Sequence, residues 1–175
     1  MIEGYTIMDG IQRIIQKLNL KSHPEGGYYR ETYRGALQIS EEDLGEEYSG
    51  KRNCSTCIYF LLTSYSFSSF HRIKQDEIWH FYQGSPLLLH LISPEGNYSI
   101  ITIGNNLEDG QLPQFVVPGG YWFAAATISN NGYSLVGCTV SPGFDFNDFE
   151  LGEKEELTSI FPQHQKIIEQ FTRTS

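Results

Sequence analysis

The residues best suited to catalysis lie in one stretch, where His71 ends a predicted strand and Glu77 opens the next. Only a short turn separates them, so both side chains can point into the same cavity. A histidine near a carboxylate in a cleft is a common arrangement for proton transfer. We therefore take His71 and Glu77 as candidate catalytic residues, and the alternative is a purely structural hydrogen-bonded pair.

Side-chain alternation along the strand that begins at Glu77 divides its residues between two faces. Trp79 shares the face of Glu77, and its ring would suit stacking on a sugar or a base. His80 and Tyr82 occupy the opposite face, and His80 would reach the cavity only if a bulge intervened. Trp79, His80 and Tyr82 are our ligand-binding candidates from this strand.

The predicted strand Tyr28–Tyr33 contributes candidates of another kind. Arg30 and Arg34 fall on one face, and a guanidinium can hold an anionic ligand with two parallel hydrogen bonds. The alternative is ion pairing with carboxylates on a neighbouring strand, which suits Arg34 better than Arg30. Tyr29, on the opposite face, is a candidate proton donor.

Asp145 lies in a segment where phenylalanines alternate with acidic residues. A carboxylate beside a histidine in a binding site can fix its tautomer and raise its basicity, so Asp145 is a further catalytic candidate. The plainer interpretation is a surface segment anchored by its phenylalanines.

Composition excludes several classes of function. The chain has 175 residues, with 12 Lys and Arg against 21 Asp and Glu, and its net charge of −9 disfavours nucleic acids and anionic membrane surfaces. No stretch reaches the roughly 18 consecutive apolar residues of a membrane span, and the N-terminus lacks the features of a signal peptide. Three cysteines are too few for a disulfide framework. We expect a reduced, cytoplasmic protein.

The elements that must position these residues are mainly β-strands. An apolar stripe formed by Ile11, Ile14, Ile15 and Leu18 predicts an N-terminal helix, and a second helix is expected from about Pro162 to Phe171. Between them, short segments rich in aromatic and β-branched residues alternate with turns. The predicted strands are Tyr28–Tyr33, Thr56–Thr63, Phe67–Ile73, Glu77–Tyr82, Leu87–Ile92, Tyr98–Ile103, Gln114–Val117, Tyr121–Ile128 and Tyr133–Val140. Such spacing indicates an all-β sandwich or barrel with flanking short helices.

We predict one domain over residues 1–175. Residues 1–24 would form the N-terminal helix and lead-in, 26–140 the β core, and 141–175 a C-terminal segment with a helix. The acidic stretch Glu41–Gly50 is expected to be a surface loop.

Two motifs resemble those of the cupin superfamily, whose fold is the double-stranded β-helix, or jelly roll. His71, Glu77 and Gly84 match the first histidine, the glutamate and the glycine of the first cupin motif. Pro118 and Gly120 match the start of the second motif. The resemblance therefore implies a jelly roll.

The same comparison shows departures at two metal-ligand places. Ile73 stands where the second histidine belongs, and Phe123 stands where the last histidine belongs. A transition-metal site needs three or four nitrogen, oxygen or sulfur ligands. We therefore predict no metal and no other cofactor, and assign Phe123 to the ligand-binding wall.

Segments 23–34, 76–82 and 141–151 together resemble one uncharacterised family, the fifth cupin family. The resemblance implies an RmlC-like jelly roll, a homodimer and a small-molecule site inside the barrel, without implying a reaction. A homodimer would bury more than about 1,000 Å².

Two classes of function remain open. In the first, a metal-independent isomerase or epimerase acts on a sugar-like or polyol substrate, with His71 as base and Glu77 or Asp145 orienting it. Tyr29 or Tyr82 would be the acid, and Arg30 would bind an anionic group of the substrate. In the second class, the protein binds a small ligand without turnover. A metal-dependent oxygenase with an unusual ligand set is a weaker alternative.

Overall fold

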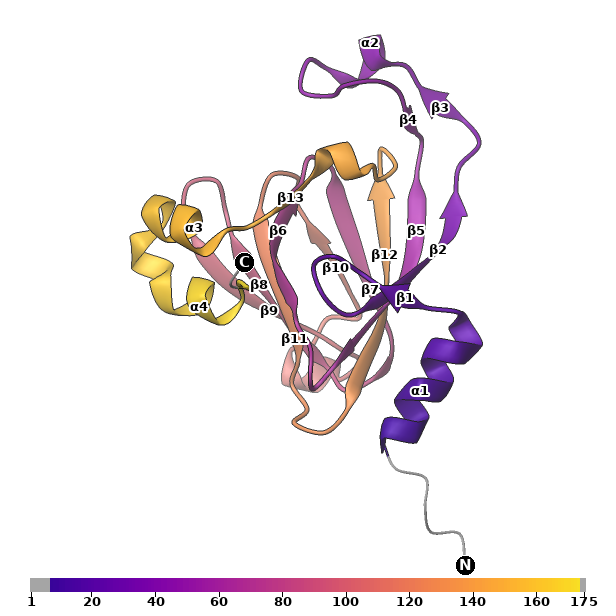
Figure 1. Ribbon diagram of the computed structural model, residues 1–175, viewed down its shortest axis with the longest axis vertical. Helices are drawn as coiled ribbons and strands as arrows, with labels where there is room; N and C mark the ends of the chain where they lie inside the picture. The colour runs from indigo at the N-terminus through magenta and orange to yellow at the C-terminus, as the bar shows by residue number, and fades with distance from the viewer. Residues whose placement is uncertain (1–6, 174–175) are drawn as a thin grey trace, which may run out of the picture.

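Two antiparallel sheets face each other in the computed structural model of the protein, which describes residues 7–173 (Figure 1). The six-stranded sheet has the order β1 (Lys21–Ser22), β2 (Tyr28–Arg34), β5 (Thr56–Thr63), β12 (Tyr133–Ser141), β7 (Asp76–Gly84) and β10 (Gln114–Val117). The five-stranded sheet has the order β13 (Phe149–Leu151), β6 (Ser68–Ile73), β11 (Trp122–Thr127), β8 (Leu87–Ile92) and β9 (Tyr98–Ile103). A separate hairpin pairs β3 (Gln38–Ile39) with β4 (Arg52–Asn53).

The predicted all-β jelly roll is confirmed, and each of the nine predicted strands is present with its ends shifted by two residues at most. β1, β3, β4 and β13 were not predicted, because strands of two or three residues are too short to show alternation. The expected surface loop Glu41–Gly50 contains one helical turn, α2 (Glu41–Leu44), and extends from the hairpin at the top of Figure 1.

Helices cover the outer faces of both sheets (Figure 1). α1 (Ile7–Leu18) packs its apolar stripe on the six-stranded sheet, against Leu61 and Leu135. α3 (Lys154–Ile160) and α4 (Gln165–Gln170) pack on the five-stranded sheet, around Trp122. The single C-terminal helix that we predicted is instead a short turn, η3 (Pro162–His164), followed by α4, while α3 lies before Pro162. Two further 3₁₀ turns are η1 (Leu107–Asp109) and η2 (Phe146–Asp148).

The main core lies between the two sheets and is aromatic at its centre. Trp79, Phe60 and Phe123 are each almost completely buried there, and the rings of Phe60 and Phe123 pack edge-on against the Trp79 indole. This packing fills one part of the interior and leaves a cavity at the other. Within residues 7–173, no helix is both long enough and apolar enough to cross a lipid bilayer.

Candidate functional site

A cavity of about 440 Å³ opens between the sheets. Its inner end is formed by four side chains that are at most 8% exposed, namely Glu25, His71, Glu77 and Cys138. Its mouth is formed by more exposed side chains, namely Lys21, Glu31, Arg34, Asp145 and Phe146. The cavity therefore has a buried polar end and an open rim.

Glu25 reaches the inner end because the turn between β1 and β2 folds into the barrel. The backbone N–H of Ser69 donates to the Glu25 carbonyl, which fastens this turn to β6. Gly26 and Gly27 follow with φ of 119° and 70°, and a Cβ at Gly26 would overlap the carbonyl oxygen of Phe67. Only glycine adopts such a conformation at so close an approach. The glycine pair thus places a carboxyl group in the interior.

The partner of His71 is Glu25, with 3.1 Å between Nε2 and Oε2. His71 Nδ1 lies 2.7 Å from the Ser69 carbonyl oxygen, and since a carbonyl can only accept, Nδ1 carries the proton. Burial, together with the nearby His23, lowers the pKa of His71 to about 3, although the bond to Ser69 acts in the opposite direction. At neutral pH, therefore, the Nε2 of His71 is an unprotonated acceptor.

Glu25 supplies the matching proton. Burial and the neighbouring Glu77 raise its pKa well above the ordinary value, although the Ser68 hydroxyl donates to Oε1 at 2.9 Å. A neutral Glu25 donates its O–H to His71 Nε2, which accounts for the short contact without burying a net charge. The two residues form an uncharged acid–imidazole pair.

Glu77 is the second buried carboxyl of the cavity. It is the second residue of β7, where it pairs with Val140 of β12 and Val117 of β10. Burial raises its pKa to about 7, and a hydrogen bond with the Cys138 thiol partly opposes this shift. Glu77 is consequently the group of this site whose charge changes near neutral pH.

His23 and Tyr29 form the wall beside Glu25. The backbone N–H of Glu25 approaches His23 Nδ1 at 3.4 Å, so Nδ1 accepts and Nε2 carries the proton. Burial, followed by the nearby Lys21, lowers the pKa of His23 to about 4. Tyr29 packs edge-on against the His23 ring at a centroid distance of 4.5 Å and lines the cavity, where we had placed a candidate proton donor.

A β-bulge in β2 changes which arginine faces the cavity. Tyr29 and Glu31 face inward, the register with β5 shifts between Glu31 and Tyr33, and Arg34 then also lines the cavity. Arg30 lies outside it, with its guanidinium over the Tyr59 ring at 5.7 Å. The assignment of Arg30 to ligand binding is corrected, because Arg30 alternates with the inward-facing Tyr29 and Glu31, while the bulge turns Arg34 inward.

The cavity-facing Arg34 is engaged by the protein itself. Its Nε and Nη2 donate to the two carboxylate oxygens of Glu31 at 2.9 and 2.7 Å. The remaining donors reach Asn53 Oδ1 at 2.9 Å and the Phe144 carbonyl at 3.2 Å. Arg34 thus connects β2 with β4 and with the segment that follows β12.

Four other ligand-binding candidates lie away from the cavity surface. Trp79 faces inward as predicted but is part of the packed core, 1% exposed. His80 and Tyr82 face outward, and His80 Nε2 lies 3.1 Å from Thr139 Oγ1. The bulge of β7 comes after His80, so it does not turn this side chain inward. Phe123 lies directly opposite His71 and packs behind its ring at 4.1 Å.

The side chains present do not fit the metal centre that the cupin motifs imply. Phe123 covers the face of His71 from the place of one ligand, and Ile73 presents an apolar side chain to the cavity at another. Across the described range, 7–173, no three His, Cys, Asp or Glu side chains are grouped to hold a metal ion.

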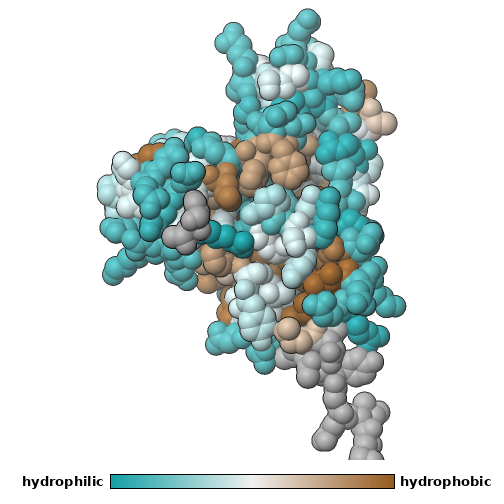
Figure 2. Space-filling model, in the orientation of Figure 1, coloured by the Kyte–Doolittle hydropathy of each residue, from teal (hydrophilic) through white to brown (hydrophobic). Residues whose placement is uncertain are grey.

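One rim of the cavity is an aromatic lip formed by Phe144, Phe146 and Phe149. Their rings pack edge-on against one another at centroid distances of 5.0 to 6.3 Å. Figure 2 shows hydrophobic side chains gathered over η2 and β13, between the α2 arm and the C-terminal helices. Asp145, between two of these rings, accepts a hydrogen bond from the backbone N–H of Asn147. Asp145 caps η2 at the mouth of the cavity. The carboxyl that contacts His71 is that of Glu25, whereas we had expected Asp145 or Glu77.

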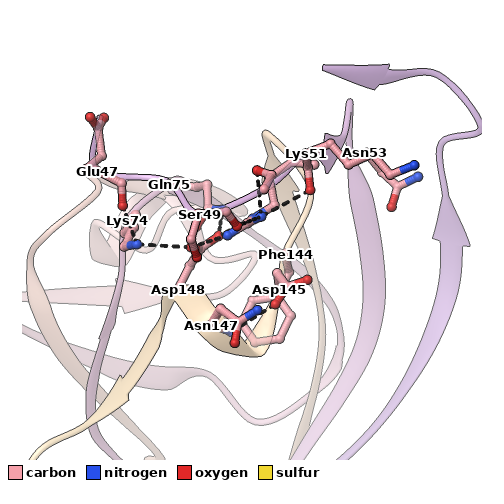
Figure 3. A network of polar contacts seen from close by, with 12 residues as sticks. Glu47, Ser49, Lys51, Asn53, Lys74, Gln75, Phe144, Asp145, Asn147 and Asp148 are labelled. Carbon is pink, nitrogen blue, oxygen red and sulfur yellow. Dashed lines mark hydrogen bonds and ion pairs between the residues drawn. The ribbon is translucent and has the colours of Figure 1, made fainter. Parts of the chain in front are cut away.

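A buried ion pair holds the lip in place. Arg52 Nε and Nη2 donate to the two oxygens of Asp148, each at 2.7 Å, and Gln75 Nε2 donates to the same carboxylate at 2.6 Å. Figure 3 shows Asp148 at the centre of this network, with Lys74 beside it. Because Asp148 ends η2, the network ties the lip to β4 and to the β6–β7 turn.

Sequence reasoning missed Glu25 and His23 as site residues. Both lie within segment 23–34, which entered only through the family resemblance. Glu25 gains its role from a contact with His71, more than 40 positions away, and His23 gains its role from the contact with Glu25. The available signal was the glycine pair after Glu25, which indicates an unusual turn but does not reveal what the turn approaches.

Comparisons with known proteins agree with this architecture. The family model described as Cupin superfamily (DUF985) matches residues 12–152. The uncharacterized protein YML079W of Saccharomyces cerevisiae is 36% identical over 165 residues, covering 87% of this chain and 81% of the yeast protein.

Solved structures show the same likeness. Protein SO0799 from Shewanella oneidensis has 40% identity and a TM-score of 0.83, covering 94% of this chain and 98% of its own. A hypothetical protein from Leishmania major has 38% identity and a TM-score of 0.85, covering 93% and 98%. Oxalate decarboxylase of Bacillus subtilis has a TM-score of 0.54 at 14% identity, covering 92% of this chain and 39% of its own, so that the likeness concerns the fold alone.

Proposed function

The chain belongs to the cupin superfamily, in the family described as DUF985, and from this premise we propose that it binds a small carbonyl compound between its sheets and moves a proton on it. The observation that carries the proposal is Glu77, a buried carboxyl with a pKa of about 7, in the same cavity as the neutral Glu25–His71 pair. A general base works best when its pKa lies near the operating pH.

The roles follow from the protonation states. Ionised Glu77 takes a proton from the carbon next to the carbonyl group of the substrate, while Glu25 donates its proton to the carbonyl oxygen, giving an enol. Glu25 then takes back the proton of the enol oxygen, which restores the carbonyl group. Glu77 gives its proton to a conjugated carbon, which completes an isomerisation; in an epimerisation a solvent proton adds to the opposite face of the original carbon and Glu77 releases its proton to solvent. His71 is a positioning residue in this scheme, because its Nε2 orients the Glu25 proton. Tyr29 is placed to hydrogen-bond the substrate from the cavity wall.

This scheme revises the roles that we expected from sequence. From the sequence we expected His71 to be the base. In the structure its Nε2 faces the protonated carboxyl of Glu25, and Glu77 has the pKa that suits a base. The substrate class that we expected from the sequence is a sugar-like or polyol small molecule. The scheme uses no metal ion, because the donor set within residues 7–173 does not fit one.

Hydrogen exchange tests the proposal directly. In deuterium oxide, the protein should catalyse exchange of the hydrogen next to the carbonyl in at least one compound of a panel of small ketones and aldehydes, followed by NMR. Glu77→Gln should slow this exchange by about 10²- to 10⁴-fold, the usual contribution of a general base. Glu150→Gln, at a half-exposed position outside the cavity, is the matched control and should leave the rate unchanged.

The pH profile supplies a second readout. The rate should rise with pH and level off above about 7, as Glu77 loses its proton. Equal rates for wild type and Glu77→Gln would refute the assignment of the base.

A second candidate function is binding without turnover, which is favoured by the phenylalanines that surround the cavity. Tight binding of a panel compound with no exchange under any condition would support this alternative instead.

A further inference from the structure

We infer that the ligand of this cavity is an uncharged compound with a planar unsaturated ring and one hydrogen-bonding carbonyl group, rather than a sugar, a polyol or a phosphate ester. The inference deepens the proposed function and rests on it. Three features of the cavity support it, namely its charges, its polar groups and its lip.

The charges of the cavity leave little to attract an anion. Its two cations, Lys21 and Arg34, are matched by two carboxylates, Glu31 and Asp145. Four of the five N–H groups of the Arg34 guanidinium already donate to the protein, so its Nε–Nη2 fork is occupied and cannot hold a phosphate with two parallel bonds. An anion placed deeper would face the buried Glu77, whose ionised form it would repel. The net charge of −9 repels anions further.

The polar groups of the inner end are few and mostly engaged. Glu25 and His71 bond to each other and to Ser68 and Ser69, and Glu77 bonds to Cys138. A sugar or polyol carries a hydroxyl on nearly every carbon, and each hydroxyl left unpaired on burial weakens binding. Three further polar side chains line the wall, namely His23, Tyr29 and Thr56, and His23 and Thr56 already accept a backbone N–H, from Glu25 and from Phe144 respectively. The rest of the wall is apolar, with Ile58, Phe60, Ile73, Val140, Phe144, Phe146 and Phe149. One or two polar atoms on the ligand can be satisfied, and a run of hydroxyls cannot.

The aromatic lip offers a surface for a flat ring. Phe146 is 52% exposed, an unusual placement for a phenylalanine in a rim that is fixed by a buried ion pair. Its ring stacks nearly parallel to His23, at 24° and 6.1 Å between centroids, so flat faces border the entrance from both β1–β2 and η2. Aromatic rings pair favourably in offset or edge-on geometry, beyond the area that they bury. A planar ligand ring would use these faces while its carbonyl points to Glu25 and Glu77.

Four probes of similar size test the inference, with dissociation constants measured by ligand-detected NMR on the full chain. Acetophenone has the ring and the carbonyl, and cyclohexyl methyl ketone keeps the carbonyl but lacks the flat ring. Phenyl phosphate adds charge, and D-fructose is polyhydroxylated. Acetophenone should bind about 3- to 10-fold more tightly than cyclohexyl methyl ketone, in line with the strength of aromatic pairs. Phenyl phosphate and D-fructose should bind more weakly than either.

A substitution at Phe146 tests whether the preference for a flat ring arises at the aromatic lip. Phe146→Leu keeps an apolar side chain at an exposed position and should remove the difference between the two ketones. Tyr65→Leu, at an aromatic residue that is also exposed but lies outside the cavity, should preserve it. Tightest binding by phenyl phosphate or D-fructose would overturn the inference, and so would equal affinity of the two ketones for wild type. Loss of deuterium exchange would instead count against the proposed function, because the ranking of affinities does not depend on turnover.

Discussion

Replacing Asp148 with alanine should destabilise the protein severely, because it would leave the guanidinium of Arg52 buried without its partner. Arg52 is 3% exposed and Asp148 4% exposed. The carboxylate accepts both hydrogen bonds of the guanidinium fork and a third from Gln75. Removing one member of a buried ion pair costs about 3–5 kcal/mol, since the remaining charge stays desolvated.

The chain itself contains a matched control. Glu150 lies two residues further along and accepts a hydrogen bond from Arg72 at 2.7 Å, the same distance as in the buried pair. The side chains of that pair are 42% and 43% exposed, however. Exposed ion pairs contribute less than about 1 kcal/mol. Asp148→Ala and Glu150→Ala therefore differ in burial while the geometry of the lost ion pair is similar.

Urea unfolding near pH 7, with both variants and wild type, gives the free energies of unfolding. A loss of 3–5 kcal/mol is a large part of the roughly 5–15 kcal/mol that holds a typical domain. The double variant Arg52→Met, Asp148→Leu is included in case Asp148→Ala does not fold. It should be more stable than Asp148→Ala, because it leaves no buried charge behind.

Acid titration tests the direction of the pKa shift of Asp148. Burial alone would raise the pKa of Asp148, but hydrogen bonds from Arg52 and Gln75 outweigh this, so its pKa is lowered. A carboxyl with a lowered folded-state pKa stabilises the protein above its unfolded-state pKa, and this contribution is lost as pH falls through the folded-state pKa. The difference between wild type and Asp148→Ala should thus shrink below about pH 4. Similar losses for Asp148→Ala and Glu150→Ala at neutral pH would refute the reasoning.

Three further predictions concern Glu77, the metal content and the assembly of the protein. The pKa of Glu77 is raised to about 7, so the stability that this group contributes should be lost as the pH rises from about 4.5 through 7. In urea unfolding this loss should reach about 3 kcal/mol at pH 8 for wild type and should be absent from Glu77→Gln. A parallel decline in both proteins would contradict the prediction. Elemental analysis of protein purified without a metal-binding tag should find no stoichiometric transition metal, because Ile73 and Phe123 occupy ligand places; one equivalent of zinc, iron, manganese or nickel would overturn this. Light scattering should give twice the chain mass of 19.9 kDa, since exposed strand edges favour two-fold pairing, and a monomer mass would refute it.

The local pattern of the sequence was enough to locate the strands and to bring His71 and Glu77 to one cavity. Both depend on interactions close in sequence: alternation defines each strand, and a short turn joins β6 to β7. The metal-ligand departures at Ile73 and Phe123 were likewise visible as residue types. The prediction of a jelly roll needed nothing beyond strand spacing and two motifs.

Tertiary structure decided which other side chains reach the cavity. The bulge in β2 turned Arg34 toward the cavity, and a bulge cannot be seen in a pattern of alternating residues. Trp79 kept its predicted face, but packing by residues from other strands filled the space around it. Glu25 became the partner of His71 only because a glycine turn folds back against β6. Its unusual protonation state follows from burial, a property of the assembled sheets that neighbouring residues in the sequence do not determine.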